Sequence, residues 1–436
     1  MNYVSTRDGS TTVALSQALI AGLAADGGLY VPASLPRFAV ADFAADESLA
    51  EVAARLLRPF FAGDALAGEL DAICAEAFDF PAPLKALPVA ETHVLELFHG
   101  PTAAFKDFGA RFLARCMTRL RRSDAPPLTI LVATSGDTGA AVAAAFHGLP
   151  NLRVVILYPD GRVSPRQAHQ LGCFGDNIHA FRVAGSFDDC QRLAKQALGD
   201  RALQEHVPLS SANSISLGRL LPQMAYYAHA SLSHWRATQA PLNVVVPTGN
   251  LGNAQAAILA RACGLPLADI ALATNANRVL PDFFAGDAYQ PKDSVATLAN
   301  AMDVGAPSNF ERLRWLYADA DALRGAFQAH AVSDDEIRLA ISTGVARYGE
   351  VFCPHTACAA HVLDVLRERG AHGHWAIIAT AHPAKFEQIV EPLVGHPVPP
   401  PAALAALLAR PSAAEPLAAE YAALHEKLRP VAAQGS

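Results

Sequence analysis

Residues 128–146 read LTILVATSGDTGAAVAAAF, and this stretch gives the clearest indication of the fold. Leu128–Ala133 is an uninterrupted apolar run, which is typical of a β-strand buried on both faces. The loop TSGDTG follows directly at residues 134–139, and an alanine-rich helix is expected after it. A strand, a glycine loop and a helix in this order predict an α/β protein with a parallel sheet.

The same order recurs on both sides of this stretch, which predicts a parallel sheet covered by helices on both faces. A second unit of the same kind begins with the strand Leu242–Pro247 and the loop TGNLGN at residues 248–253. The further strands are expected at Val94–Leu97, Arg153–Tyr158, His179–Val183, Ile270–Ala273 and Trp375–Ala379, and the helices at Arg111–Arg121, Pro165–Leu171, Phe187–Leu198 and Ala254–Cys263.

These elements predict three regions along the chain. Residues 1–95 carry amphipathic helical stretches and form an N-terminal region that packs on the large domain. Residues 96–235 form a small α/β domain with the TSGDTG loop. Residues 236–436 form a large α/β domain with the TGNLGN loop and, after the proline run at 399–401, a helical tail on the surface.

Composition excludes several classes of protein. The net charge is -7, the pI is about 6.1 and no Lys/Arg block occurs, which argues against a nucleic-acid partner. No apolar stretch is long enough to cross a bilayer, and the first residues lack the layout of a secretion signal. The seven cysteines are odd in number and widely spaced, which indicates reduced thiols. We therefore expect a cytoplasmic protein without a membrane partner.

Both glycine loops follow a buried strand and open a helix, where backbone N–H groups point outward unpaired and favour an anion. Neither loop contains a P-loop lysine or a G-x-G-x-x-G motif, so neither indicates a nucleotide. Ordinary tight turns between strand and helix explain each loop, taken alone, equally well. The candidate phosphate ligands are Gly249, Asn250, Gly252 and Asn253, and the candidate ligands of a second anion, such as a carboxylate, are Ser135, Gly136, Thr138 and Gly139.

Lys106 stands between two phenylalanines in FHGPTAAFKDFG, residues 98–109. An amine desolvated by such neighbours loses its proton more easily and becomes a nucleophile toward aldehydes. A lysine whose stem covers apolar surface is the alternative. Lys385 is a rival for the same role, although its place at a helix start suggests a solvated side chain.

Several other polar residues could be taken for metal ligands or catalytic groups, but the sequence does not support such a role. Cys353, His355 and Cys358 resemble metal spacing but lack a closed set of four ligands, so no metal site is expected. His372 and His374 are interpreted as turn residues, His99 and His382 as accessory groups, and Asp107 as structural.

The segment HGPTAAFKDFGARF, residues 99–112, closely resembles the threonine synthases of the longer class. Further segments agree in the same order, and the resemblance runs from Tyr3 to about Val394. They are YVSTRDG from Tyr3, TSGDTGAAVAAAF from Thr134, SSANSISLGRLLPQ from Ser210, VPTGNLGN from Val246, NAMDVGAPSN from Asn300 and TAHPAKF from Thr380. Cys353 departs from the family, which often has an acidic residue there, and this puts a local hydrogen bond in doubt.

The resemblance implies a fold-type-II pyridoxal phosphate enzyme, similar to the β-subunit of tryptophan synthase, with two parallel-sheet domains and an N-terminal helical region. Its activity would be that of a carbon-oxygen lyase acting on phosphate. The small-molecule substrate would be O-phospho-L-homoserine, converted with water to L-threonine and phosphate. The protein would be a monomer or a homodimer.

The resemblance also assigns roles to single residues. Lys106 matches the lysine that forms the imine with the cofactor and carries the proton transfers. Thr380 matches the hydroxyl facing the pyridine nitrogen, and Asp137 is a possible cofactor contact. Gly249, Asn250, Leu251, Gly252 and Asn253 match the cradle of the cofactor phosphate. Ser135, Gly136 and Thr138 match the segment that meets the substrate carboxylate, and Asn213, Ser214 and Arg219 match part of the pocket for the substrate phosphate.

Two other hypotheses remain open on the sequence. One is a phospholyase-like paralogue or an amino-acid dehydratase with the same cofactor. A dehydratase would not need the second phosphate pocket around Asn213–Arg219. The other is an α/β module without this cofactor, or one that binds a nucleotide. For Thr380, the alternative to a cofactor contact is a threonine at the end of a strand whose hydroxyl forms hydrogen bonds with backbone groups.

Overall fold

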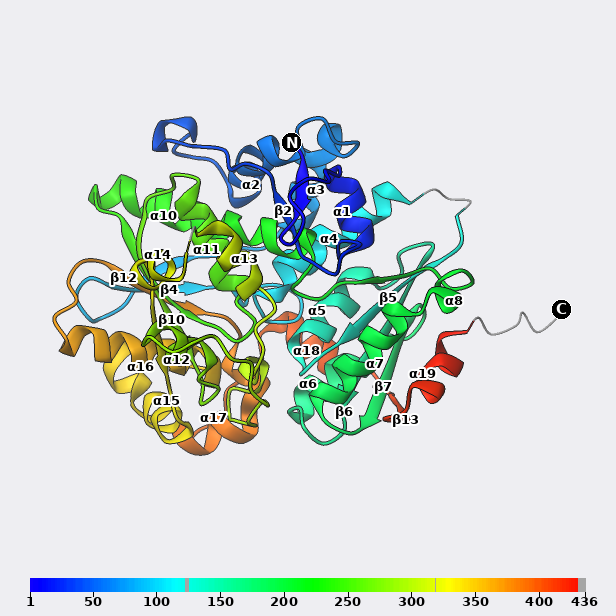
Figure 1. The fold of residues 1–436 in the computed structure, drawn as a ribbon. Helices are drawn as coiled ribbons and strands as arrows, with labels where there is room; N and C mark the ends of the chain where they lie inside the picture. The colour runs from blue at the N-terminus through cyan, green and yellow to red at the C-terminus, as the bar shows by residue number, and fades with distance from the viewer. Residues whose placement is uncertain (122–124, 318, 430–436) are drawn as a thin grey trace.

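Two parallel sheets, one in each half of the molecule, organise the chain (Figure 1). The computed structural model describes residues 1–121, 125–317 and 319–429. No helix in these ranges is long and apolar enough to cross a membrane.

The first sheet has five strands in the order β13-β7-β6-β5-β8, all parallel. Alternate side chains of its central strands point to opposite faces, so Ile130 and Val132 join the main core while Leu131 and Ala133 join a separate core. The strands are β5 (Leu128–Ala133), β6 (Leu152–Pro159), β7 (Ile178–Ala184), β8 (Leu209–Ser211) and β13 (Glu415–Ala418), and the helices of this half are α5 (Asp137–Phe146), α6 (Pro165–Gly172), α7 (Phe187–Gly199), α8 (Arg201–Gln204), α18 (Ala402–Leu408) and α19 (Tyr421–Leu428).

The second sheet has six strands in the order β11-β10-β9-β12-β4-β3, and only β3 runs antiparallel to its neighbour. Val244 and Val246 face the main core, whereas Val245 and Ile377 face a core formed with α15 and α16. The strands are β3 (Leu84–Ala86), β4 (Thr92–Glu96), β9 (Leu242–Pro247), β10 (Leu267–Thr274), β11 (Gln328–Ala331) and β12 (Trp375–Ala379), and the helices of this half are α10 (Met224–Thr238), α11 (Gly252–Ala262), α12 (Val279–Phe284), α13 (Phe310–Leu316), α14 (Ala320–Ala326), α15 (Asp334–Tyr348), α16 (Pro354–Glu368) and α17 (Glu387–Val394).

The N-terminal residues form a two-stranded antiparallel sheet, β1 (Tyr3–Ser5) and β2 (Tyr30–Pro32), and three helices that sit over both halves. These helices are α1 (Leu15–Ala21), α2 (Leu49–Leu57) and α3 (Leu70–Ala77). Helix α2 packs on α10, while α1 and α3 pack on α4 (Lys106–Leu120), which also contacts α5 and α9 (Leu217–Leu220). Short 3₁₀ turns at Val40–Asp42, Arg58–Phe61, Ala67–Glu69, Leu221–Gln223, Asn300–Met302 and Pro383–Phe386 complete the elements.

The strand pairing differs from the expected regions at both ends of the chain. Residues 84–96, expected in the N-terminal region or at its border, form two strands of the six-stranded sheet, because β4 pairs with β12 along its whole length. Residues 415–428, expected in a surface tail of the large domain, instead supply β13 and α19 to the five-stranded half. Leu417, Leu424 and Leu428 are buried there, so this part of the tail belongs to a core.

Candidate active site

The carboxyl ends of β5, β9 and β12 face one cavity between the two halves, as is usual for ligand sites in parallel sheets. Its empty volume, counted out into the open solvent at its mouth, is about 1040 Å³. The structure brings thirteen of the fourteen expected site residues to its wall, namely Lys106, Ser135, Asp137, Thr138, Asn213, Ser214, Arg219, Gly249, Asn250, Leu251, Gly252, Asn253 and Thr380.

Lys106 is the first residue of α4, and backbone pairing fixes its position beside Thr380. The amide N of Phe105 donates to the carbonyl of Thr380 at 2.8 Å, and the amide of His382 donates to the carbonyl of Ala103 at 3.0 Å. These bonds tie the segment before α4 to the segment after β12, so two parts of the chain separated by more than 270 positions meet at the cavity.

The Lys106 amine is suited to act as a nucleophile. Burial lowers the pKa of Lys106 to about 8; the Asp137 carboxylate opposes this change, and the positive charges of Arg219 and Lys385 add to it. Among the described residues, no carboxylate lies within ion-pair distance of its Nζ, which sits 5.7 Å from the ring centroid of Phe105. A substantial share of the amine is therefore unprotonated near neutral pH.

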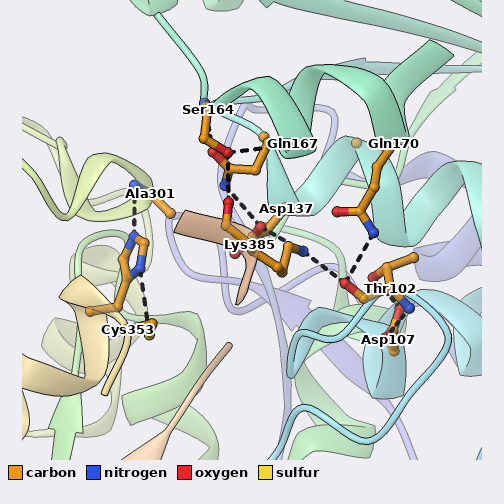
Figure 2. A network of polar contacts seen from close by, with 12 residues as sticks. Thr102, Asp107, Asp137, Ser164, Gln167, Gln170, Ala301, Cys353 and Lys385 are labelled. Atoms are coloured by element: carbon orange, nitrogen blue, oxygen red, sulfur yellow. Dashed lines mark hydrogen bonds and ion pairs between the residues drawn. The ribbon is translucent and has the colours of Figure 1, made fainter. Parts of the chain in front are cut away.

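Lys385 lies close by but is fully engaged, contrary to the solvated side chain that its position suggested. It has no exposed surface, and its Nζ is 2.8 Å from Asp137 Oδ1 and donates to the carbonyl of Thr102 at 2.8 Å (Figure 2). The expectation was wrong because Pro383–Phe386 packs into the core next to α6 instead of facing solvent.

Asp137 is held as a buried carboxylate at the start of α5. Burial by itself would raise the pKa of Asp137, but the nearby charges of Lys385, Lys106 and His355 together lower it below its usual range. Its Oδ1 also accepts from Gln167 Nε2 at 2.9 Å (Figure 2). The carboxylate is therefore ionised and turned toward two lysines.

Gly136 is the one expected site residue that does not reach the cavity wall. Its φ is +131°, and a Cβ there would lie 2.6 Å from Gln167 Nε2, so glycine is needed for the backbone to turn into α5. The hydroxyl of Thr134 accepts from the amides of Gly136 at 3.0 Å and Gly139 at 2.9 Å and so holds the loop in shape. The structure therefore gives Gly136 a role in shaping the backbone of the loop.

The loop at residues 249–253 forms a compact cradle before α11. A Cβ on Gly249 would lie 2.7 Å from Met302 Cα, and Leu251 has a left-handed φ of 62° that aims the loop into the helix. Asn253 Oδ1 accepts from the hydroxyls of Tyr226 at 2.6 Å and Tyr227 at 2.9 Å, whereas its buried Nδ2 finds no partner among the residues the structure describes. The Nδ2 group and the free amides of the helix start suit an anion.

The side chain of Asn250, which is on the cavity wall, joins two neighbouring loops. Its Nδ2 donates to Ser214 Oγ at 2.5 Å, and its Oδ1 accepts from the amide of Ser308. Its backbone carbonyl accepts from Asn309 Nδ2 at 2.9 Å. Asn250 thereby holds the cradle against the segment that carries Ser214.

A second polar corner of the cavity contains Asn213 and Arg219. Arg219 is only 2% exposed; its Nη1 donates to the carbonyl of Ala212 at 2.6 Å, while its Nε is buried without a partner among described residues. Burial lowers the pKa of Arg219 to about 10, which leaves the guanidinium charged at neutral pH. Asn213 Oδ1 is likewise unpaired within the described part of the chain. Unpaired buried polar atoms of this kind indicate a bound ligand.

His355 lines the cavity and was missed as a site residue, because the sequence interpretation weighed it only as a metal ligand. Its Nε2 accepts from the amide of Ala301 at 3.1 Å (Figure 2). Burial lowers the pKa of His355 to about 4; the Asp137 carboxylate opposes this change, and the charges of Lys106 and Lys385 add to it. Cys353 caps α16 by accepting from the amide of Thr356. The quoted segment NAMDVGAPSN from Asn300 was the available signal, since Ala301, Met302, Val304, Ala306 and Ser308 also line the cavity.

The other polar residues near the site have local partners. The carboxylate of Asp107 accepts from the amide of Thr102 at 2.9 Å and from its hydroxyl at 2.6 Å, which confirms a structural role. His99 Nε2 lies 2.7 Å from Glu96 Oε2, and His382 Nδ1 accepts from the amide of Ala384. Neither histidine lines the cavity.

Comparisons with known proteins agree with this geometry. Residues 81–383 match a family model described as pyridoxal-phosphate dependent enzyme, residues 2–78 match threonine synthase N terminus, and residues 356–428 match threonine synthase, C-terminal. A threonine synthase of Serratia marcescens is 39% identical over 98% of this chain and 99% of its own length.

Solved structures show the same relationship. The crystal structure of threonine synthase from Escherichia coli superimposes with a TM-score of 0.91, 38% identity and coverage of 98% of this chain and 99% of that one. A threonine synthase from Brucella melitensis, solved with PLP bound, gives a TM-score of 0.89, 36% identity and the same coverage.

Fold and site together define a fold-type-II enzyme that depends on pyridoxal phosphate, which confirms the expected fold class and cofactor. Within that class the chain belongs to the threonine synthase family, and the matches extend over nearly its whole length.

Proposed function

We propose that this enzyme converts O-phospho-L-homoserine and water to L-threonine and phosphate, and that Lys106 forms the covalent bond to its cofactor. One observation carries the proposal: an amine of lowered pKa lies in a cavity that is also lined by two separate sets of anion-binding groups, the glycine loop with the unpaired Nδ2 of Asn253 and the buried guanidinium of Arg219. Two phosphates, one from the cofactor and one from the substrate, match two such sets.

The residues of the cavity fit pyridoxal phosphate. Gly249, Gly252 and the unpaired Nδ2 of Asn253 would hold its phosphate at the start of α11, where no Cβ of residue 249 fills the space. When bound, the cofactor supplies an electron sink for negative charge that develops on the carbon atoms of the substrate. Lys106 and Thr380 lie next to each other and line the same cavity as this cradle.

Lys106 has a second task once the substrate amine has replaced it. Its free amine would accept a proton from the substrate and return it at another carbon, and a pKa of about 8 suits both directions near neutral pH. Asp137 and Lys385 would orient this exchange, because their ion pair fixes the negative charge nearest to the amine.

The departing phosphate needs positive charge and N–H donors in a site from which water is largely excluded. Arg219 and Asn213, with Ser214 beside them, would supply this corner, and Ser135 and Thr138 would meet the substrate carboxylate at the start of α5. An amino-acid dehydratase would have no use for the buried charge of Arg219 here, so this corner favours a phosphorylated substrate.

We propose that the protein is a monomer or a homodimer, since one copy of the chain supplies every residue assigned above. The seven cysteines are free and buried, which supports work in a reducing compartment such as the cytoplasm.

The test is reductive trapping of the purified enzyme with borohydride, followed by peptide mass spectrometry. We expect a pyridoxyl group on Lys106, and we expect Lys106→Ala to lose the adduct and to release phosphate from O-phospho-L-homoserine about 10³-fold more slowly or worse. The matched control is Lys195→Ala, an exposed lysine on α7, which should behave as wild type. An adduct on Lys385, or phosphate release without threonine formation, would contradict the assignment.

A further inference from the structure

Three histidines from distant parts of the chain meet at the edge of the six-stranded sheet that lies opposite the cavity. His93 is the second residue of β4, His374 directly precedes β12, and His234 lies near the end of α10. Each offers one ring nitrogen, and the three nitrogens lie within 4.8 Å of one another. The cavity is at the carboxyl ends of these parallel strands, so this cluster, which we call the histidine cluster, is a separate place on the molecule.

The histidine cluster contains polar atoms whose bonding is incomplete. His93 Nδ1 and His374 Nδ1 are buried and have no hydrogen-bond partner within the described ranges. The rings contact one another closely, with centroids 4.7 Å apart for His234 and His374 and 5.2 Å apart for His93 and His234. Two of the three imidazoles therefore have an unused nitrogen, and a cation bound between the three rings would provide these nitrogens with a partner.

We propose that the histidine cluster binds one divalent transition-metal ion of the Zn²⁺ class. Imidazole nitrogen is a preferred ligand of Zn²⁺, Cu²⁺ and Ni²⁺, whereas Mg²⁺ and Ca²⁺ prefer oxygen. Ligands at about 2.0–2.1 Å in a tetrahedron around Zn²⁺ are about 3.4 Å from each other. Side-chain shifts of about 1 Å would close the cluster to this geometry, and water would take the fourth position.

The surroundings hold the ligands in place while leaving an entry route. The hydroxyl of Thr238 lies 3.2 Å from His234 Nε2, and Asn243 Nδ2 donates to the carbonyl of His374 at 3.0 Å. The Thr238 contact bears on the orientation of the His234 ring, and the Asn243 contact holds the backbone at His374. His93 and His374 are partly exposed, so an ion in solvent can reach them, whereas His234 is only 4% exposed.

The sequence could not reveal this site. The three histidines are separated by about 140 residues each, which matches no metal-binding spacing, and His374 was interpreted as a turn residue. Within the described part of the chain, this is the one group of three or more metal-capable side chains brought within such a distance. A bound ion would cross-link α10 to the two strands, and its effect would be on stability.

The experiment uses the cofactor-loaded full chain, freed of metal with a chelator and returned to a non-chelating buffer. Titration calorimetry with ZnCl₂ and metal analysis after gel filtration should give one ion per chain, with Kd at micromolar concentration or below. Co²⁺ at the same site should show the visible bands of a four-coordinate ion. Zn²⁺ at a hundredfold excess over Kd should raise Tm by about 3 °C.

Two variants and a matched control complete the test. His234→Ala and the milder His374→Gln should each weaken Zn²⁺ binding about 100-fold and abolish the Tm shift. His396→Gln, an exposed histidine elsewhere, should bind as wild type. The cofactor absorbance reports that each variant is folded. Absence of Zn²⁺ binding in the wild type, or binding that neither variant weakens, would overturn the proposal.

Discussion

The lowered pKa of Lys106 has a consequence for how the cofactor-free enzyme takes up its cofactor. Only the unprotonated amine attacks an aldehyde, and with a pKa of about 8 roughly one amine in ten is unprotonated at pH 7. The rate of reconstitution with pyridoxal phosphate should therefore rise with pH and level off above about pH 8. Absorbance stopped-flow across pH 6.5–10 measures it. A rate that climbs steadily to pH 10 would indicate a lysine of ordinary pKa.

The same measurement isolates the influence of Asp137. Because its carboxylate raises the pKa of Lys106 against the effect of burial, Asp137→Asn should move the midpoint of the reconstitution profile to lower pH. An unchanged midpoint would mean that the carboxylate does not act on Lys106.

The buried pair of Asp137 and Lys385 also bears on stability. Removal of one partner leaves the other charge buried without a counter-charge, so Lys385→Met should lower the free energy of unfolding by about 3–5 kcal/mol. The double variant Asp137→Asn with Lys385→Met should lose less than the sum of the single losses. Urea unfolding of all four proteins measures the coupling, and strictly additive losses would show that the pair contributes nothing as a pair.

At the scale of elements, the loop before α11 depends on a close approach of two backbones. Gly249→Ala places a methyl group 2.7 Å from Met302 Cα and must displace the cradle, which should weaken cofactor binding by about 1–3 kcal/mol, or roughly tenfold to hundredfold. Gly325→Ala is the control, since a Cβ there meets nothing within 4 Å. Fluorescence titration of the cofactor-free proteins gives both affinities. Equal affinities would show that the loop tolerates the methyl group.

The sequence predicts the central elements well and the edge elements poorly. Leu128–Ala133, Leu242–Pro247 and Trp375–Ala379 are confirmed residue for residue, because strands buried on both faces are uninterrupted apolar runs. The edge strands β3 and β13 were missed because only Leu417 of their seven residues is buried, so no apolar run in the sequence indicates a strand there. The helix expected at Arg111–Arg121 begins five residues earlier, at Lys106, where the preceding glycine and proline suggested a loop.

For the site, the sequence correctly placed residues at the cavity where they belong to a motif. It did not place residues whose side chains are buried by segments distant in the sequence. The loops around Gly249 and Ser135 reach the cavity as expected. Lys385 and His355 could not be assigned, since Lys385 is buried where Pro383–Phe386 packs beside α6, and His355 is buried where α16 meets the segment at Ala301. No local pattern encodes a contact of that range.

At the scale of the whole molecule, the last described residues matter for stability and not for chemistry. Leu424 in α19 is fully buried against the five-stranded sheet, so Leu424→Ala should cost about 2–5 kcal/mol, while the adduct on Lys106 and the affinity for cofactor should not change. Leu339→Ala, at a leucine that is 58% exposed, should cost little. A loss of cofactor affinity in the Leu424 variant would show that the two ends of the molecule are coupled.

The pairing of β4 with β12 joins residues 92–96 to residues 375–379, across most of the chain. On the ribosome, the parallel neighbour of β4 therefore emerges only when synthesis is nearly complete, and until then β4 has only β3 to pair with. The first half can build most of the five-stranded sheet in the meantime, because β5 to β8 are contiguous. Nascent chains stopped before residue 375 should thus carry Lys106 without the Thr380 segment beside it, and competence to capture the cofactor would be acquired in one late step.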